Sequence, residues 1–114
     1  MIFLGPAKNQ EGEMALKNFR TYQLSVEFYR AVVPYRCPAH LKAQLLRSAS
    51  SVSLNLAEAD GRSSAQDRRR LFTIAMGSVR ESQAILELIS VKKDAVSELA
   101  DRLAGHLYRL LHPV

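Results

Sequence analysis

The chain has 114 residues, of which 47% are hydrophobic and 24% are charged, and its net charge at pH 7 is +5. This length allows one domain with one hydrophobic core, and the composition excludes a disordered chain and a membrane-embedded one. The single cysteine, Cys37, excludes an internal disulfide bond and fits a reducing compartment.

The N-terminal part divides into an irregular segment and a predicted helix. Residues 1–15 show no hydrophobic period, so we expect a flexible tail there and one bundle domain over residues 16–114. Apolar residues then recur at helical spacing and predict a first helix over Leu16–Val33. Its apolar positions form two neighbouring stripes. One consists of Tyr22, Val26, Tyr29 and Val33, and the other of Leu24, Phe28 and Ala31.

A second helix is predicted over Pro38–Asp60, with proline suited to its first turn and Gly61 as its stop. One face of this helix is apolar and consists of Leu41, Leu45, Ala49, Val52 and Leu56. The opposite face carries a ladder of polar residues, which are Arg47, Ser51, Asn55 and Glu58. With Glu81 of the next helix, we expect this ladder to fix helices or subunits to one another.

A third helix is predicted to reach about Ile89, and two capping pairs suit its start: Ser63 with Gln66, or Ser64 with Asp67. The residues expected to face inward are Leu71, Ile74, Ala75, Ser78, Ser82, Ile85 and Ile89. Small residues predict a close approach of the second and third helices, and these are Ala49, Gly77, Ser78 and Ser82.

A fourth helix is predicted from about Asp94, and its apolar stripe is the clearest in the chain: Val96, Leu99, Leu103, Leu107 and Leu110. Four helices with short connections predict an all-α fold, an antiparallel up-and-down four-helix bundle. Leu46, Leu54 and Ala57 fall outside the core face of the second helix, and this surplus apolar surface predicts a homo-oligomer. The alternative is that scattered exposed leucines are ordinary.

Three segments of the sequence, "FRTYQLSVEFYR", "QLLRSASSVSLNLAEADGR" and "IAMGSVRES", are similar to a known family. They resemble the four-helix-bundle proteins encoded in intervening sequences of bacterial 23S ribosomal RNA genes. The positions that match the family's motifs are Gln44, Arg47, Ser51, Asn55, Ala57, Glu58, Gly61, Arg62, Ala75, Gly77, Ser78 and Glu81. Ser48 and Ala59 depart from the pattern, which has alanine and glycine there.

The resemblance implies an assembly and a class of partners. Members of the family form pentameric, barrel-like rings, so a homopentamer is expected. Relatives serve retroelements as accessory proteins that bind nucleic acid and a reverse transcriptase. The resemblance therefore implies RNA or DNA as a ligand and a reverse transcriptase or ribonucleoprotein as a partner.

Positive charge is concentrated in residues 62–80, where five arginines accompany one carboxylate, Asp67. Guanidinium groups bind phosphates in bidentate fashion, so this segment predicts a nucleic-acid contact with little sequence specificity. The proposed phosphate contacts are Arg62, Arg68, Arg69, Arg70 and Arg80. The alternative is a solvated basic face, or arginines that pair with Asp67 and with a neighbouring subunit.

No residue pattern predicts catalysis, so we expect a protein that is not an enzyme and that uses no cofactor or metal. A di-iron bundle needs Glu-x-x-His pairs, and none of the three histidines has a glutamate three positions before it. The alternative function is a protein-interaction module that docks a polymerase or ribonucleoprotein without touching nucleic acid. The apolar runs are too short to cross a bilayer, and the first residues do not resemble a signal peptide, so we expect a cytoplasmic protein.

Overall fold

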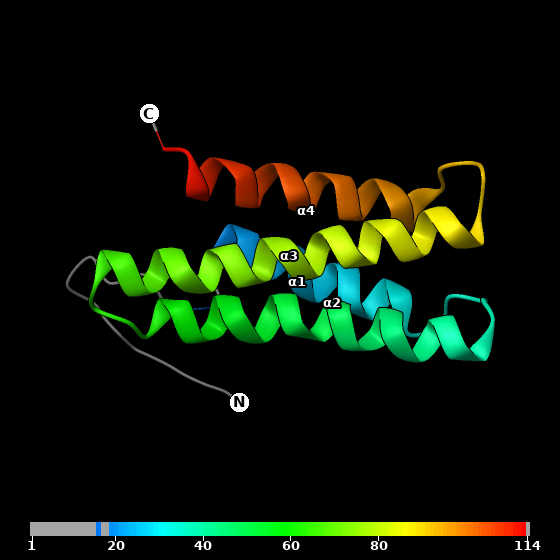
Figure 1. Ribbon diagram of the computed structural model, residues 1–114, viewed down its shortest axis with the longest axis horizontal. Helices are drawn as coiled ribbons and strands as arrows, with labels where there is room; N and C mark the ends of the chain where they lie inside the picture. Colours follow the sequence, from blue (N-terminus) through cyan, green and yellow to red (C-terminus); the bar gives the residue numbers. More distant parts are fainter. Residues whose placement is uncertain (1–15, 17–18, 114) are drawn as a thin grey trace.

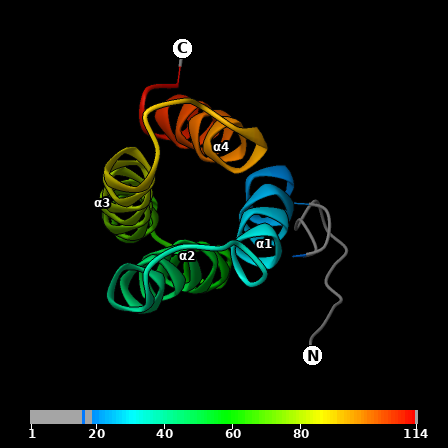
Figure 2. The same ribbon diagram turned by 90° about the vertical axis from the view of Figure 1, so that its right-hand side faces the viewer.

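The computed structural model describes Leu16 and residues 19–113, so the tail expected over residues 1–15 lies outside the described residues. The helices of this part are α1 (Arg20–Val32), α2 (Ala39–Asp60), α3 (Ala65–Ile89) and α4 (Ala95–Leu111). They run alternately up and down (Figure 1). Viewed along the bundle, each helix neighbours the one before it in sequence, and α4 closes the ring against α1 (Figure 2). The expected all-α four-helix bundle is confirmed.

Side-chain caps fix where the last two helices begin. The Ser64 hydroxyl accepts a hydrogen bond of 3.0 Å from the Asp67 backbone N–H, so the second of the two predicted capping pairs starts α3. The Asp94 carboxylate accepts one of 2.9 Å from the Ser97 N–H and starts α4. Such caps satisfy amides that have no partner inside the helix.

The first helix begins later than the predicted Leu16. Phe19 has an extended backbone, with φ −83° and ψ 101°, and the helix starts only at Arg20. Gly61 stands at the end of α2 as predicted, but its φ of −89° is one that any residue adopts. Within the part of the chain that is described, no helix is long and apolar enough to cross a bilayer.

The core lies along the bundle axis and is built from the predicted apolar stripes of α2 and α4. Its largest fully buried side chains are Phe28, Leu45, Leu56, Leu71, Leu103 and Leu107. The prediction for α3 was wrong at Ile74, which is 42% exposed, while Val79 and Leu86 are buried instead. Four of the positions predicted to face inward are buried, which are Leu71, Ala75, Ser82 and Ile85, whereas Ser78 and Ile89 are only partly buried. The buried face of α3 is therefore turned slightly toward Val79 and Leu86.

Pairs of serine hydroxyls join neighbouring helices. Between α2 and α3, the Oγ atoms of Ser48 and Ser82 lie 2.7 Å apart, and the Ser78 hydroxyl donates to Ser51 Oγ at 2.8 Å. These contacts confirm that small residues bring the two helices together. Gly77 was wrongly included in that contact, because a Cβ atom built there meets nothing within 4 Å.

At one end of the bundle, Tyr35 ties the α1–α2 connection to the start of α4. Its hydroxyl donates to Asp94 Oδ2 at 2.5 Å, and the Lys42 ammonium donates to the Tyr35 carbonyl at 2.6 Å. The hydrogen bond to Asp94 raises the pKa of Tyr35 to about 12, with help from burial. The same bond lowers the pKa of Asp94 below its usual value.

We expect Tyr35→Phe to lower the free energy of unfolding by about 1 kcal/mol at pH 7, since a partly exposed hydrogen bond to a carboxylate is lost. The lowered pKa of Asp94 means that this contribution disappears as pH falls through that pKa. The raised pKa of Tyr35 means that it also disappears as pH rises from 10 toward about 12. Urea unfolding of both proteins across this pH range measures the difference.

The matched control is Tyr29→Phe, because the Tyr29 hydroxyl makes no hydrogen bond within the described residues. If Tyr35→Phe lowers the free energy of unfolding by no more than the control does, or by the same amount at pH 2 and pH 7, the hydrogen bond from Tyr35 to Asp94 does not have the stabilising role given to it here.

Candidate nucleic-acid interface

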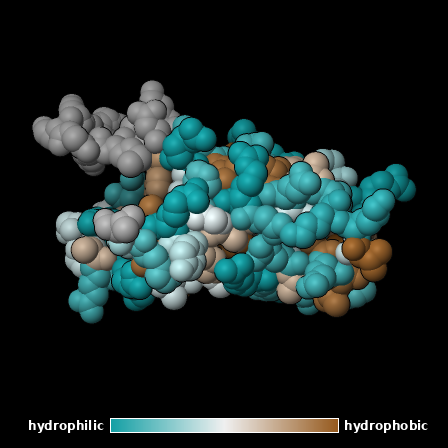
Figure 3. Space-filling model, turned by 90° about the horizontal axis from the view of Figure 1, so that it is seen from above, coloured by the Kyte–Doolittle hydropathy of each residue, from teal (hydrophilic) through white to brown (hydrophobic). Residues whose placement is uncertain are grey.

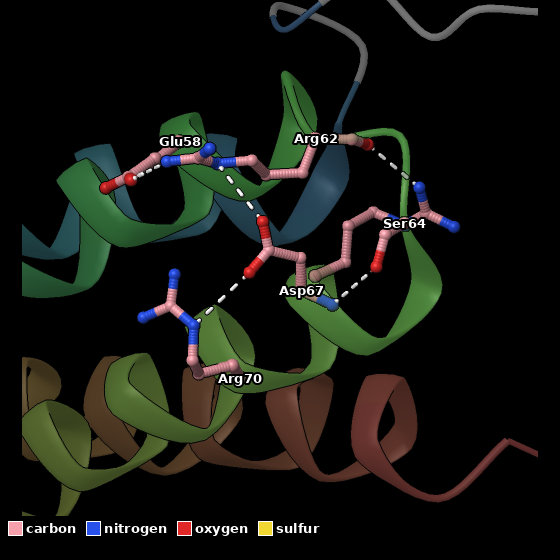
Figure 4. A network of polar contacts seen from close by, with 6 residues as sticks. Glu58, Arg62, Ser64, Asp67 and Arg70 are labelled. Carbon is pink, nitrogen blue, oxygen red and sulfur yellow. Dashed lines mark hydrogen bonds and ion pairs between the residues drawn. The ribbon is translucent and has the colours of Figure 1, made fainter.

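The connection between α2 and α3 brings four of the predicted phosphate-binding arginines to one end of the bundle. We call Glu58, Arg62, Asp67, Arg68, Arg69 and Arg70 the junction cluster. Arg62 Nη2 lies 2.5 Å from Glu58 Oε2, and Arg62 Nε lies 3.7 Å from Asp67 Oδ2. Arg70 Nε lies 3.3 Å from Asp67 Oδ1, so one carboxylate bridges two arginines (Figure 4).

These ion pairs are exposed to solvent. The side chains of Glu58 and Arg62 are 49% and 43% exposed, and that of Asp67 is 36% exposed. The hydrogen bond from Arg62 to Glu58, with the charge of Asp67, holds the pKa of Arg62 above its ordinary value. Exposed pairs contribute little to stability, so a phosphate oxygen is able to replace either carboxylate.

Arg68 and Arg69 have neutral partners instead. Arg68 Nη1 donates to the carbonyl of Arg62 at 2.9 Å, and Arg69 Nη1 donates to the carbonyl of Leu111 at 2.5 Å. The second bond caps the end of α4, where the last carbonyls have no partner inside the helix. A carbonyl carries no net charge, so the positive charges of both arginines stay uncompensated by these contacts.

The fifth predicted contact, Arg80, does not join the junction cluster. It lies ten residues beyond Arg70 on α3, which is about 15 Å along the helix axis. Its guanidinium donates to Gln83 Oε1 at 2.9 Å. The arginines of residues 62–80 therefore do not form one continuous basic surface, because Arg80 lies apart from the other four.

The residues of the predicted polar ladder of α2 also take part in separate contacts. The Asn55 amide donates to the carbonyl of Ser51 at 2.8 Å and to its hydroxyl at 3.2 Å, so this part of the ladder reaches α3 through Ser78. Glu58 instead belongs to the junction cluster. Arg47 and Glu81 point outward, and neither side chain has a hydrogen bond or ion pair among the described residues.

A second basic surface was not predicted from the sequence. It combines Arg20 of α1 with Arg102, His106 and Arg109 of α4, and we call it the α1–α4 basic surface. The spacing of the three α4 residues, four and then three, is a helical signal that places them on one face. The contribution of Arg20 depends on how α1 packs against α4, which the sequence does not reveal.

In the described part of the chain, no group of three or more His, Cys, Asp or Glu side chains is arranged to hold a metal ion.

A family model with the description 23S rRNA-intervening sequence protein matches residues 17–111. No curated protein matches the chain significantly. The matched range includes all four described helices and the whole junction cluster.

Proposed function

Because the chain belongs to the family of 23S rRNA-intervening sequence proteins, we propose that it is a non-enzymatic, homo-oligomeric bundle that binds nucleic acid in the cytoplasm. The junction cluster is the contact surface in this proposal, and the oligomer is expected to be a pentameric ring. Binding depends on phosphates more than on bases, since guanidinium groups contact the backbone without reading sequence.

The nucleic-acid proposal depends on the uncompensated positive charges of Arg68 and Arg69. Among the described residues, both guanidinium groups have neutral carbonyls as their hydrogen-bond acceptors. They lie in the first turns of α3, where free amides also favour anions. A phosphate at this end therefore gains two unneutralised cations and the positive end of a helix dipole.

The net charge of the cluster limits the affinity of one subunit. Its four arginines are opposed by Glu58 and Asp67, and the neighbouring Asp60 reduces the net charge of residues 58–70 to +1. Phosphate binding of this size is weak, but several copies on one polyanion raise the overall affinity through effective concentration. The nucleic-acid proposal and the oligomer proposal therefore support each other.

The outer face of α2 and α3 supports self-association. Ile74, Glu81 and Leu88 are seven residues apart and share one stripe of α3, while Arg47 and Leu54 share one stripe of α2. The apolar members of the two stripes are exposed, Leu54 at 68%, Ile74 at 42% and Leu88 at 74%. We call these five residues the α2–α3 outer face.

Charge and shape on the α2–α3 outer face suit a second copy of the chain. Arg47 and Glu81 carry opposite charges and have no partner among the described residues, so they are available to pair between subunits. Gly77 lies beside this stripe with open space around it, which lets another helix approach closely. An isolated subunit gains nothing from an exposed glycine in mid-helix, since alanine is better there by about 1 kcal/mol.

The alternative, a module that docks a polymerase or ribonucleoprotein, has a specific observation in its favour. Apolar atoms gather at the end of the bundle where α3 leads into α4 (Figure 3). Val91 is fully exposed there, and a pocket of about 290 Å³ lined by Val91, Leu86 and Asp101 among others adjoins it. An exposed apolar surface of this kind is typical of protein contacts.

We expect the triple variant Arg68→Ser, Arg69→Ser and Arg70→Ser to bind RNA more weakly and with less salt dependence. Each lost phosphate contact lowers the slope of log K against log salt by roughly 0.7 to 0.9, so the total change is about 2 per subunit. Retention of a labelled RNA on the protein between 50 and 300 mM salt measures it, and circular dichroism checks the fold.

The matched control removes the same charge elsewhere, with Arg30→Ser, Arg36→Ser and Lys92→Ser. A second variant, Asp67→Asn, releases Arg62 and Arg70 and is expected to bind RNA more tightly than the parent chain. Equal losses in the triple variant and its control, or weaker binding by Asp67→Asn, contradict the junction cluster as the contact surface.

For the oligomer, we expect Leu54→Asp to give a single subunit at concentrations where the parent chain is assembled. Leu54 is mostly exposed in one subunit, so the substitution costs the fold little and places a charge in the interface. Light scattering measures the mass, and Val33→Asp, at a half-exposed valine outside the α2–α3 outer face, is the control. An unchanged mass for Leu54→Asp would remove the α2–α3 outer face from the assembly.

A further inference from the structure

The edge between α1 and α4 carries positive charge that no hydrogen bond or ion pair among the described residues offsets. This edge lies diagonally opposite the edge between α2 and α3 that leads into the junction cluster (Figure 2). Its charged members are the residues of the α1–α4 basic surface, Arg20, Arg102, His106 and Arg109.

The fold brings these four side chains together from two helices. Arg102, His106 and Arg109 occupy positions i, i+4 and i+7 of α4 and therefore share one face, with neighbouring side chains about 5 to 6 Å apart at Cβ. Arg20 is the first residue of α1, which packs antiparallel to α4. The start of α1 therefore meets the C-terminal half of α4.

His106 reports the electrostatic potential of this surface. Partial burial lowers the pKa of its imidazole, and the positive charges of Arg109, Arg20 and Arg102 lower it further. Among the described residues, no carboxylate acts on this pKa in the opposite direction. All three guanidinium groups thus lie close enough to one imidazole to resist its protonation.

The arginines of the junction cluster differ in this respect. Arg62 and Arg70 each have a carboxylate partner, whereas Arg20, Arg102 and Arg109 have no hydrogen bond or ion pair among the described residues. Glu98 lies one turn before Arg102, but no ion pair forms between them in the described structure. Three exposed, unpaired guanidinium groups around one point repel each other, and a bound anion relieves that repulsion.

We propose that the α1–α4 basic surface is a phosphate-binding site, formed by Arg20, Arg102 and Arg109 around His106. Its ligand is a phosphate group, either of a polynucleotide backbone or free inorganic phosphate. Guanidinium groups on two helices bind phosphate oxygens in bidentate fashion, and the imidazole N–H supplies a further donor. The site uses none of the junction-cluster residues and does not depend on the function proposed for them.

The test follows the three histidines by NMR as pH is varied, in sodium chloride alone and with inorganic phosphate or a short single-stranded RNA at equal ionic strength. A phosphate beside His106 offsets the arginines, so the pKa of His106 is expected to rise by roughly half a unit or more. His40 is the second residue of α2, whose start lies at the other end of the bundle, so phosphate is not expected to change its NMR signals and it serves as an internal control.

Two variants separate this site from the junction cluster. Arg102→Ser with Arg109→Ser is expected to abolish the rise at His106, and both positions are exposed, so the fold tolerates the change. The triple variant at residues 68–70 is expected to keep the rise. If the junction cluster proves not to bind RNA, the expected rise in the pKa of His106 is unaffected. If that rise is absent, the proposal for the junction cluster is likewise unaffected.

The two sources of phosphate give different dose dependence. A rise at His106 with micromolar RNA and only at much higher inorganic phosphate identifies a polynucleotide as the ligand. A rise with inorganic phosphate that RNA does not match identifies free phosphate. The proposal is overturned if neither changes the pKa of His106 beyond the effect of sodium chloride, or if the rise survives in the Arg102→Ser, Arg109→Ser protein.

Discussion

The close contact between α2 and α3 depends on two pairs of serine hydroxyls. Ser48 with Ser82 and Ser51 with Ser78 bring the two helices together where larger side chains would hold them apart. Ser48 and Ser82 are almost completely buried, and the Ser48 hydroxyl also donates to the Leu45 carbonyl at 3.2 Å, so it is the Ser82 hydroxyl that depends on the pair. This pairing fixes the rotation and the height of α3 against α2. It thereby decides which residues form the α2–α3 outer face and where the junction cluster lies.

The two basic surfaces differ in how their charge is balanced. In the junction cluster, Glu58 and Asp67 share the charge of Arg62 and Arg70, and backbone carbonyls hold Arg68 and Arg69 in place. Part of the charge of the junction cluster is therefore compensated within the chain. At the α1–α4 basic surface, the arginines have no such partners within the described residues, and His106 is held toward its neutral form. A phosphate therefore competes with existing ion pairs at the first surface and relieves repulsion at the second.

Local signals in the sequence predicted most of the fold. Two capping pairs were predicted for α3, and the structure uses Ser64 with Asp67. The predicted start of α4 near Asp94 is also found, and there the structure adds a carboxylate cap that the sequence analysis did not name. A cap acts within one turn of its own helix, so such starts are local signals. The errors concern contacts between helices. Ile74 and Gly77 were assigned to the core side of α3, since periodicity gives the spacing of a stripe more securely than its rotation. The distance between Arg80 and the other arginines can be predicted from the sequence, because it follows from the length of α3. The proximity of Arg20 to His106 cannot, because it depends on how α1 packs on α4.

The buried contact of Ser48 with Ser82 makes the central claim testable. The most direct measurement is a double-mutant cycle with Ser48→Ala, Ser82→Ala and both together, followed by urea unfolding. Ser48→Ala leaves the buried Ser82 hydroxyl without its partner and is expected to cost about 1 to 2 kcal/mol. Ser82→Ala leaves Ser48 its bond to the Leu45 carbonyl and is expected to cost about 1 kcal/mol. The double variant then loses less than the sum of the two, by about 1 kcal/mol. Strictly additive losses would show that the hydroxyl pair does not hold α2 against α3.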